Sequence, residues 1–472
     1  MRISHPVGPP ADRIANPRGC ASDNPEPCLK TCELFQQGRA RLNRPMMKNL
    51  LEQARTVMPG GAFTTYVLDE EVDLVIKNGK GSKVYDVNGR EYIDCINGSG
   101  PMLLGHARPE VVEAVRQMAE CPSNYYFLNE KGIELAQMLV DAIPCAEQVK
   151  YGVSGSDANL YALRLARAYT GKTKVLKFEG GFLGGLDQAL MSMAPQAPFP
   201  DYPLSAPDSA GIPRAAQDDV LIAPYNNLAV VEAIVGQHHA EIAAIIVEAE
   251  QRCIPPKAGF LQGLRDLCDR YGIILIFDEI VTGFRLSWQG AQGRFGVTPD
   301  MASYGKVIGG GQALSAVAGP REIMRLCNPR EDAGPQQCFT GNTLCGNAMA
   351  SAAGIATLKV LGTSGTYERL EEIGQKFRAG VAKAFADCGE EGQALGLGPV
   401  SVIVNTNAEI VDYRSSIASD RKRLRRIMTE MVKRGVLTNG KFYLSLAMSD
   451  ADIDLVHSAL EDSIRAVQRN EG

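Results

Sequence analysis

An apolar run at 273–277 ends abruptly in two carboxylates, Asp278 and Glu279. A continuous apolar run of this length predicts a strand that is buried on both faces of a parallel sheet. Asp278 then lies at the carboxyl end of that strand, where open α/β sheets bind ligands. The next residue with reactive chemistry is Lys306, which stands between Gly305 and a glycine-rich turn at 309–311. We expect Asp278 and Lys306 to hold opposite ends of one cofactor.

A lysine and an aspartate are the two groups that pyridoxal 5′-phosphate (PLP) requires. An amine forms a Schiff base with the cofactor, and a carboxylate pairs with the protonated pyridine nitrogen. Lys306 suits the first task, and Asp278 suits the second because burial strengthens its attraction to a cation. Ile280 could pack against one face of the ring. Two plainer interpretations stay open: a surface lysine beside glycine, and an aspartate that caps the helix after the strand.

The segment 153–157 lies between a predicted strand and a predicted helix and could hold a phosphate. Gly155 permits close approach of the backbone, and Ser156 offers a hydroxyl group. The helix N-terminus adds free N–H groups and the positive end of its dipole. Ser154 and Asp157 also have the pattern of an ordinary N-cap, so the residues alone leave both interpretations open.

One aromatic residue, Phe182, stands in a glycine-rich loop at 180–185 that follows a predicted strand at 174–178. A phenylalanine among glycines is poorly placed for a hydrophobic core and well placed to lie over a flat ligand. The alternative is that Phe182 anchors the loop.

Composition narrows the classes of protein that need be considered. The chain has 472 residues, 45% of them apolar, and its 49 basic and 54 acidic residues give a net charge of −5. This charge offers no case for nucleic acid or a membrane surface, and no apolar run approaches the roughly 20 residues of a membrane span. The five His and 12 Cys form no metal or nucleophile motif, so we expect no metal and free thiols in a cytoplasmic protein.

The order of the predicted elements indicates an α/β fold with two domains. Strands and helices alternate through 106–345, which predicts a large, mostly parallel sheet with helices on both faces. We expect 46–105 and 346–472 to form a small α+β domain, and 1–45 to be an irregular extension without a signal peptide. Within 46–105, the Asn78-Gly79 pair predicts a hairpin turn between strands at 72–76 and 83–87.

Taken together, these segments resemble the class III aminotransferases, which are PLP enzymes of fold-type I. The similarity extends over about 46–467 and is greatest to the glutamate-1-semialdehyde aminomutase branch and its β-amino-acid aminotransferase relatives. The motifs that carry it are 58–61 (MPGG), 100–106 (GPMLLGH), 154–158 (SGSDA), 163–167 (LRLAR), 277–285 (FDEIVTGFR), 305–311 (GKVIGGG) and 343–347 (TLCGN).

The resemblance implies a role for each matching residue at the reactive end of the cofactor. Lys306 is implied to be the Schiff-base lysine and the proton shuttle. Asp278 is implied to pair with the pyridine nitrogen, and Phe182 and Ile280 to lie on opposite faces of the ring. Gln251 is implied to contact the ring hydroxyl.

The resemblance also implies a phosphate site shared between two subunits. Ser154, Gly155 and Ser156 are implied to bind the phosphate, and Thr343 to reach it from the partner subunit. The family therefore implies a homodimer with shared active sites.

The chain departs from this family where substrate would bind. The segment 62–67 lacks the arginine that holds a substrate carboxylate in the aminomutases, a loss of roughly several kcal/mol. Ser99 replaces a tryptophan and should widen the pocket. Arg252 and Arg285 could still bind a carboxylate, although a surface side chain and a strand-end ion pair are the respective alternatives.

We therefore expect a PLP-dependent aminotransferase that moves an amino group from a donor to a ketone or aldehyde acceptor, larger or less acidic than glutamate semialdehyde. A PLP-dependent aminomutase or racemase is the first alternative. A non-catalytic PLP-fold binding protein is the second, and the paired Lys306 and Asp278 argue against it.

Overall fold

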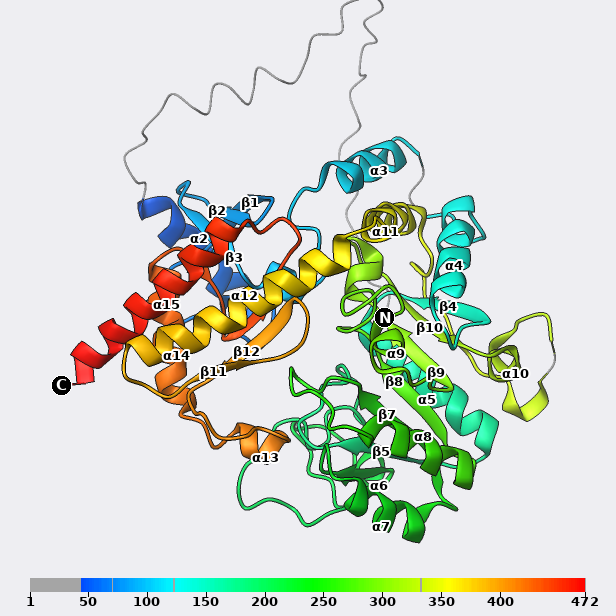
Figure 1. The fold of residues 1–472 in the computed structure, drawn as a ribbon. Helices are drawn as coiled ribbons and strands as arrows, with labels where there is room; N and C mark the ends of the chain where they lie inside the picture. The colour runs from blue at the N-terminus through cyan, green and yellow to red at the C-terminus, as the bar shows by residue number, and fades with distance from the viewer. Residues whose placement is uncertain (1–43, 70, 122–123, 332, 472) are drawn as a thin grey trace, which may run out of the picture. The chain divides into compact units, whose positions relative to one another are not determined.

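A seven-stranded sheet with the order β4-β10-β9-β8-β7-β5-β6 forms the centre of the large part of the protein (Figure 1). Figure 1 is drawn from a computed structural model, which describes residues 44–69, 71–121, 124–331 and 333–471. The five neighbouring strands from β9 to β6 are parallel, and β10 runs antiparallel to both β9 and β4. The predicted mostly parallel α/β sheet is confirmed.

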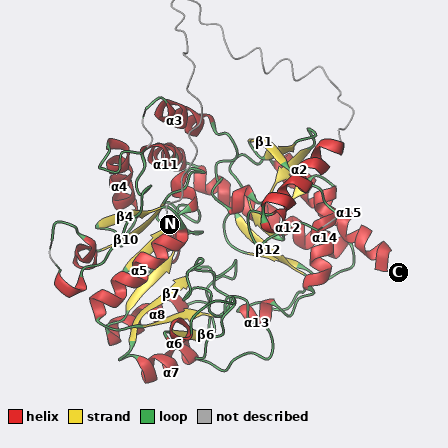
Figure 2. Ribbon diagram, turned by 180° about the vertical axis from the view of Figure 1, so that it is seen from behind, coloured by secondary structure: helices red, strands yellow, loops and turns green. Residues whose placement is uncertain are grey.

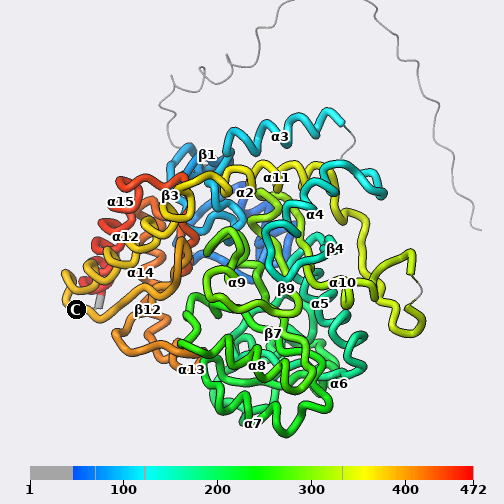
Figure 3. Tube along the Cα trace, turned by 45° about the vertical axis from the view of Figure 1, so that its right-hand side comes forward, coloured from blue at the N-terminus to red at the C-terminus, as the bar shows by residue number. Residues whose placement is uncertain are grey.

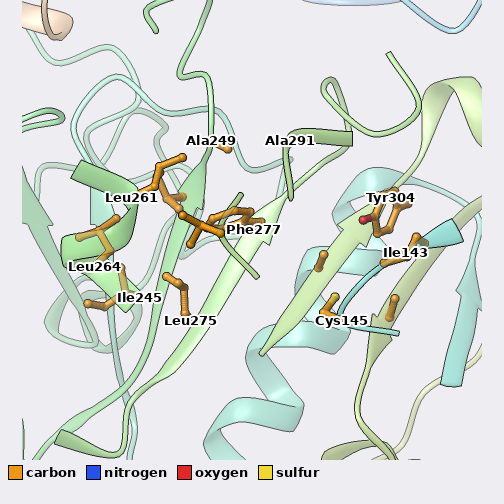
Figure 4. Packing of buried hydrophobic residues seen from close by; sticks show 14 of the residues in the cluster. Ile143, Cys145, Ile245, Ala249, Leu261, Leu264, Leu275, Phe277, Ala291 and Tyr304 are labelled. Atoms are coloured by element: carbon orange, nitrogen blue, oxygen red, sulfur yellow. The ribbon is translucent and has the colours of Figure 1, made fainter. Parts of the chain in front are cut away.

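Successive residues along the inner strands contribute to two different cores, one on each face of the sheet. In β7, Ile245 and Val247 join one cluster, whereas Ala244 and Ile246 join the other. Helix α8 covers the first face, where Figure 4 shows Leu261 and Leu264 near Ile245, and α5 covers the second. Side chains alternate along a strand, so a strand that is apolar throughout must be covered on both faces.

The chain before α3 and the chain after α11 build a second region together. The short strand β13 pairs in parallel with β3, and so joins residues near 436 to residues near 93 in a sheet of order β1-β2-β3-β13. The same region contains a three-stranded sheet of order β11-β12-β14. Helices α12, α14 and α15 cover these strands (Figure 2). Helices α12 and α15 lie side by side along most of their lengths (Figure 3). The boundaries predicted at 105/106 and 345/346 stay predictions.

The strands have the following bounds: β1 Ile76–Lys80, β2 Lys83–Asp86, β3 Glu91–Asp94, β4 Gln148–Gly152, β5 Lys174–Phe178, β6 Val220–Ala223, β7 Ile242–Glu248, β8 Ile274–Asp278, β9 Met301–Tyr304, β10 Ser315–Gly319, β11 Gln393–Leu395, β12 Val400–Val404, β13 Val436–Leu437 and β14 Lys441–Tyr443.

The α-helices have the following bounds: α2 Arg44–Val57, α3 Pro109–Ala119, α4 Glu130–Ala142, α5 Gly155–Thr170, α6 Arg214–Asp218, α7 Leu228–His238, α8 Phe260–Tyr271, α9 Gly290–Phe295, α10 Arg321–Met324, α11 Ala348–Leu361, α12 Thr366–Asp387, α13 Tyr413–Ser416, α14 Arg421–Lys433 and α15 Asp450–Glu471.

The predicted hairpin at Asn78-Gly79 is wrong. Both residues lie inside β1 and pair with β2, and the turn is formed by Gly81 and Ser82. Gly81 has φ of 60°, and a two-residue hairpin loop requires such a positive φ. Two neighbouring dipeptides that contain glycine, Asn78-Gly79 and Gly81-Ser82, were therefore candidates for the same turn. The strand predicted at 72–76 is irregular except for its last residue.

Most of the predicted N-terminal extension, 1–43, lies outside the described residues, so its irregular structure stays a prediction. Over the described ranges, no helix is both long and apolar enough to cross a membrane.

Candidate active site

Three adjacent parallel strands carry polar side chains that lie in register at, or one residue before, their carboxyl ends. Glu248 at the end of β7 pairs with Asp278 at the end of β8, and Asp278 pairs with Ser303 in β9. All three are buried. Because parallel strands present their carboxyl ends at one edge, the fold concentrates these polar groups where α/β sheets bind ligands.

Asp278 is a buried carboxylate, with 4% of its surface exposed, and it is fixed by two donors. The Asn159 side chain donates to Oδ2 at 2.7 Å, and the Ile280 N–H donates to Oδ1 at 2.9 Å. Burial, reinforced by the nearby Glu248, raises the pKa of Asp278 to about 7. A carboxylate held in this way favours a cationic partner, which would restore its ordinary ionisation.

Lys306 follows β9 after one residue, Gly305, and opens the short 3-10 helix Lys306–Gly309. Its φ of 47° places it in the left-handed region, which side-chain-bearing residues seldom occupy without a structural or functional reason. Burial lowers the pKa of the Lys306 amine, against the opposing effects of Tyr443 and Asp278. A lowered pKa increases the neutral, nucleophilic fraction of an amine at neutral pH.

The segment 153–157 forms an N-cap and leaves an open helix end beside it. Ser154 caps α5 by accepting from the Asp157 N–H at 3.2 Å, and the Asp157 carboxylate accepts from the Ser154 N–H at 2.9 Å. The cap interpretation is therefore correct for Ser154, while α5 still presents its N-terminal N–H groups at Gly155 and Ser156. The Gly185 N–H donates to Ser156 Oγ at 2.9 Å, which ties the glycine-rich loop to this helix end.

Phe182 lies on that loop with 45% of its surface exposed, so its ring does not fill a core. Its N–H donates to Glu248 Oε2 at 2.9 Å, which fixes the loop to the end of β7. Ile280 lies in contact range of Gly155 and Gly305, because a Cβ on either glycine would lie 3.1 Å from Ile280 Cδ1. Phe182 and Ile280 thus come from loops that follow β5 and β8.

Gln251 is buried, and its side-chain N–H donates to the Glu179 carbonyl at 2.7 Å. Its Oε1 would lie 3.1 Å from a Cβ on Gly181, so it faces the same glycine-rich loop. Thr343 is exposed, and its neighbour Asn342 donates to Asp157 Oδ2 at 3.2 Å. The segment that carries Thr343 therefore reaches the N-terminal turn of α5 within one chain.

The predicted substrate residues have three different environments. Ser99 is exposed, with φ of 67°. Arg252 is exposed and lies over the Phe182 ring, with its guanidinium carbon 5.7 Å from the ring centre. Arg285 is fully buried, and it donates from Nε to the Val281 carbonyl at 2.8 Å and from Nη2 to the Gly100 carbonyl. Arg285 is thus a backbone brace rather than a strand-end ion pair.

The structure adds residues that the sequence interpretation missed. Asn159 joins Asp278 to Ser303, whose hydroxyl donates to Asn159 Oδ1 at 2.5 Å. The sequence offered one signal for Asn159, namely a polar residue on the otherwise apolar, buried face of α5. Tyr443 and Lys441 reach the neighbourhood of Lys306 from β14, more than 130 residues later in the chain, and no local pattern indicates this.

These residues fit PLP by the chemistry of their donors and acceptors. A buried carboxylate with a raised pKa suits a protonated pyridine nitrogen, a half-buried amine with a lowered pKa suits an aldehyde, and the open N-terminus of α5 suits a phosphate. A Cβ at position 155 would fill the space beside Ile280, so glycine keeps a narrow cradle there. A separate cavity of about 370 Å³ lies beside α3, and its lining includes neither Lys306 nor Asp278.

Comparisons with known proteins agree with this geometry. The family model described as aminotransferase class-III matches residues 66–464. A glutamate-1-semialdehyde 2,1-aminomutase from Desulforamulus reducens is 37% identical over 432 residues, covering 89% of this chain and 98% of that protein. The crystal structure of an omega-transaminase from Sphaerobacter thermophilus has a TM-score of 0.84 and 32% identity, covering 92% and 99% of the two chains. A β-phenylalanine aminotransferase from Variovorax paradoxus has a TM-score of 0.78 and 28% identity, covering 90% and 95%.

Proposed function

The chain belongs to the class III aminotransferase family and is a PLP-dependent transaminase, and we propose that it moves an amino group from a donor amine to a ketone or aldehyde acceptor. We propose that this acceptor is larger or less acidic than glutamate semialdehyde. The observation that carries the proposal is the pair of Asp278 and Lys306 at the ends of adjacent strands, beside a segment 62–67 that lacks the aminomutase arginine.

Bound PLP supplies an aldehyde that bonds to amines and a ring that withdraws electrons from the carbon next to the amine. In the proposal, the Asp278 carboxylate holds the positive charge of the ring nitrogen, and Asn159 keeps that carboxylate in place. The Lys306 amine would hold the cofactor covalently, and a donor amine would take its place there. Lys306 Nζ would then take the proton from the donor's α-carbon and deliver it to the cofactor carbon that carried the aldehyde, and its lowered pKa favours the first of these transfers.

The remaining contacts of the cofactor are part of the same proposal. Phe182 and Ile280 lie over the two faces of the ring, Gln251 contacts its hydroxyl, and Ser154, Gly155 and Ser156 bind the phosphate. This assignment is supported by the positions of all six residues around the ends of β5, β7 and β8 and the start of α5.

We also propose a cytoplasmic homodimer in which Thr343 completes the partner's phosphate site. The exposure of Thr343 supports this assignment, because its side chain is open to a second subunit although the neighbouring Asn342 contacts α5 of its own chain.

An aminomutase or racemase is the second candidate, and one observation favours it. The relative from Desulforamulus reducens, an aminomutase by name, is 37% identical along almost its whole length. Against it stand the absent arginine at 62–67 and the serine at position 99, both on the substrate side.

A donor–acceptor screen tests the proposed function. The PLP-loaded protein is mixed with single amine donors, and the absorbance of bound cofactor is followed as pyridoxal is converted to pyridoxamine 5′-phosphate. The transaminase proposal requires this conversion, its reversal by added ketones or aldehydes, and a new amine product. Isomerisation of one substrate without a second carbonyl compound would favour the mutase. If no donor changes the absorbance, the proposed function fails.

A further inference from the structure

Positive side chains gather on the side of Lys306 that faces β14. Lys441 Nζ lies 5.1 Å from the centre of the Tyr443 ring, and the Arg285 guanidinium carbon lies 5.4 Å from it. Tyr443, Lys441 and Arg285 all act electrostatically on the Lys306 amine, and Arg252 acts on Lys441. Lys441 and Arg285 therefore flank one buried phenol, and Arg252 acts electrostatically on Lys441.

The register of β14 explains why Lys441 points toward this space. Phe442 packs into the core of the C-terminal region, with its ring centre 4.7 Å from that of Phe377. Alternate residues of a strand face opposite sides, so Lys441 and Tyr443 must both face away from that core. Tyr443 packs there against Cys253, next to Arg252.

A tight turn at 251–254 fixes the direction of the Arg252 side chain. Arg252 and Cys253 both have positive φ, at 55° and 70°, and the Ile254 N–H donates to the Gln251 carbonyl at 2.8 Å. Left-handed backbone at two consecutive residues that are not glycine is strained, and such conformations are concentrated at functional sites. The turn places the Arg252 guanidinium over Phe182, beside the proposed ring site.

No carboxylate among the described residues pairs directly with these cations, although Glu248 acts on Lys441 from beyond ion-pair distance. In the parts of the chain that the structure describes, Lys441, Arg252 and Arg285 form no ion pair within 4.0 Å of a carboxylate, and Arg285 Nη1 is buried without a hydrogen-bond partner. Glu250 is the nearest buried acid in sequence to Arg252. It accepts from the Leu397 N–H at 2.7 Å, and burial raises its pKa to about 8 against the opposing effects of Lys441 and Arg378, which disfavours its charged form.

We propose that Lys441 and Arg252 form the carboxylate-binding side of the substrate site, and that the substrate carries a carboxylate beyond its reacting carbon on the side of β14. This inference rests on the proposed aminotransferase function and selects a larger acidic substrate within it. In this inference, Lys441 and Arg252 take over the carboxylate that 62–67, without an arginine, can no longer bind. Tyr443 holds Lys441 by contact with its ring, so the ammonium group is oriented before substrate binds.

The inference can be tested with pairs of donors that differ only in charge. 3-Aminobutanoate, 4-aminopentanoate and 5-aminohexanoate are each compared with their primary amides, and kcat/KM is measured from the conversion of bound cofactor in the PLP-loaded enzyme. For at least one chain length, the ratio of acid to amide should be about 10 or more in the wild type, because a charge-assisted contact is lost in the amide.

Lys441→Met should lower that ratio at least about tenfold, Arg252→Gln should lower it about three- to tenfold, and Lys441→Arg should keep it within about threefold, because arginine retains the charge. Lys422→Met, an exposed lysine on α14, is the matched control and should leave the ratio unchanged. An equal ratio in the wild type and in Lys441→Met would overturn the inference.

A binding measurement separates failure of this inference from failure of the proposed function. If no donor reacts, transamination is refuted, and calorimetric titration of the PLP-loaded protein with glutarate and with glutaramide decides the question of the carboxylate. The inferred carboxylate site is supported if glutarate binds more tightly than glutaramide and its binding weakens about tenfold in Lys441→Met but not in Lys441→Arg. Equal affinity for the two ligands, or no binding of glutarate, refutes it.

Discussion

Replacing Asp278 by Asn tests the electrostatic core of the site, because it removes a charge and keeps the size of the side chain. In the cofactor-free protein, burial raises the pKa of Asp278 from its ordinary 3.8 to about 7. A difference of about 3 units corresponds to about 4 kcal/mol between the two protonation states. The charged carboxylate is therefore a destabilising group until a cation reaches it.

The sign of the pH dependence follows from the raised pKa. Because the folded pKa exceeds the unfolded one, the contribution of Asp278 to stability is complete below about pH 4 and is lost as the pH rises to about 7. Between pH 5.5 and 8, the wild type should lose about 2 kcal/mol relative to Asp278→Asn. Glu250, whose pKa burial also raises, is present in both proteins and cancels in the difference.

Thermal melting of the two PLP-free proteins measures this effect. An unfolding entropy of about 2.1 cal/mol/K per residue gives about 1 kcal/mol/K for 472 residues that unfold together, so the difference in Tm should change by about 2 °C across this pH range. With PLP bound the order reverses: the variant should hold the cofactor at least about 100-fold more weakly, because the ring nitrogen loses its buried partner. A Tm difference that does not vary with pH, or unchanged PLP affinity, would refute this account of Asp278.

Three further substitutions test the other contacts. Lys306→Ala should reduce turnover by at least about 10³-fold and leave PLP removable by dialysis, because no other residue is proposed to hold the cofactor covalently or to move the proton. Lys422→Ala is the control, and retained turnover in Lys306→Ala would contradict the proposed role. Asn159→Ala should raise the dissociation constant of PLP about 10- to 100-fold in a spectroscopic titration, because Asp278 loses its side-chain donor, and an unchanged constant would mean that Asn159 only packs. Phe182→Leu should raise the same constant about threefold to tenfold by removing an aromatic face, whereas loss of folding in its circular dichroism spectrum would show that Phe182 is a loop anchor instead.

The sequence by itself determined the cofactor half of this protein. The apolar run before Asp278, the glycines around Lys306 and the Ser-Gly-Ser segment at 154–156 are local patterns, and each is interpretable because backbone conformation and burial follow from neighbouring residues. The alternation of strands and helices predicted the mostly parallel sheet for the same reason. Where two local signals competed, as at Asn78-Gly79 and Gly81-Ser82, the sequence could not choose, because register with β2 decided the turn.

Only the tertiary structure decided what surrounds Lys306 on the substrate side. Lys441 and Tyr443 come from β14. They face Lys306 because Phe442, on the opposite face of the strand, packs into a core built from α12 and its neighbours. The ends of β7, β8 and β9 are brought together by strand pairing, which aligns Glu248, Asp278 and Ser303. Such contacts join residues far apart in the chain, so their identity depends on packing between elements and on strand register, which no local spacing records.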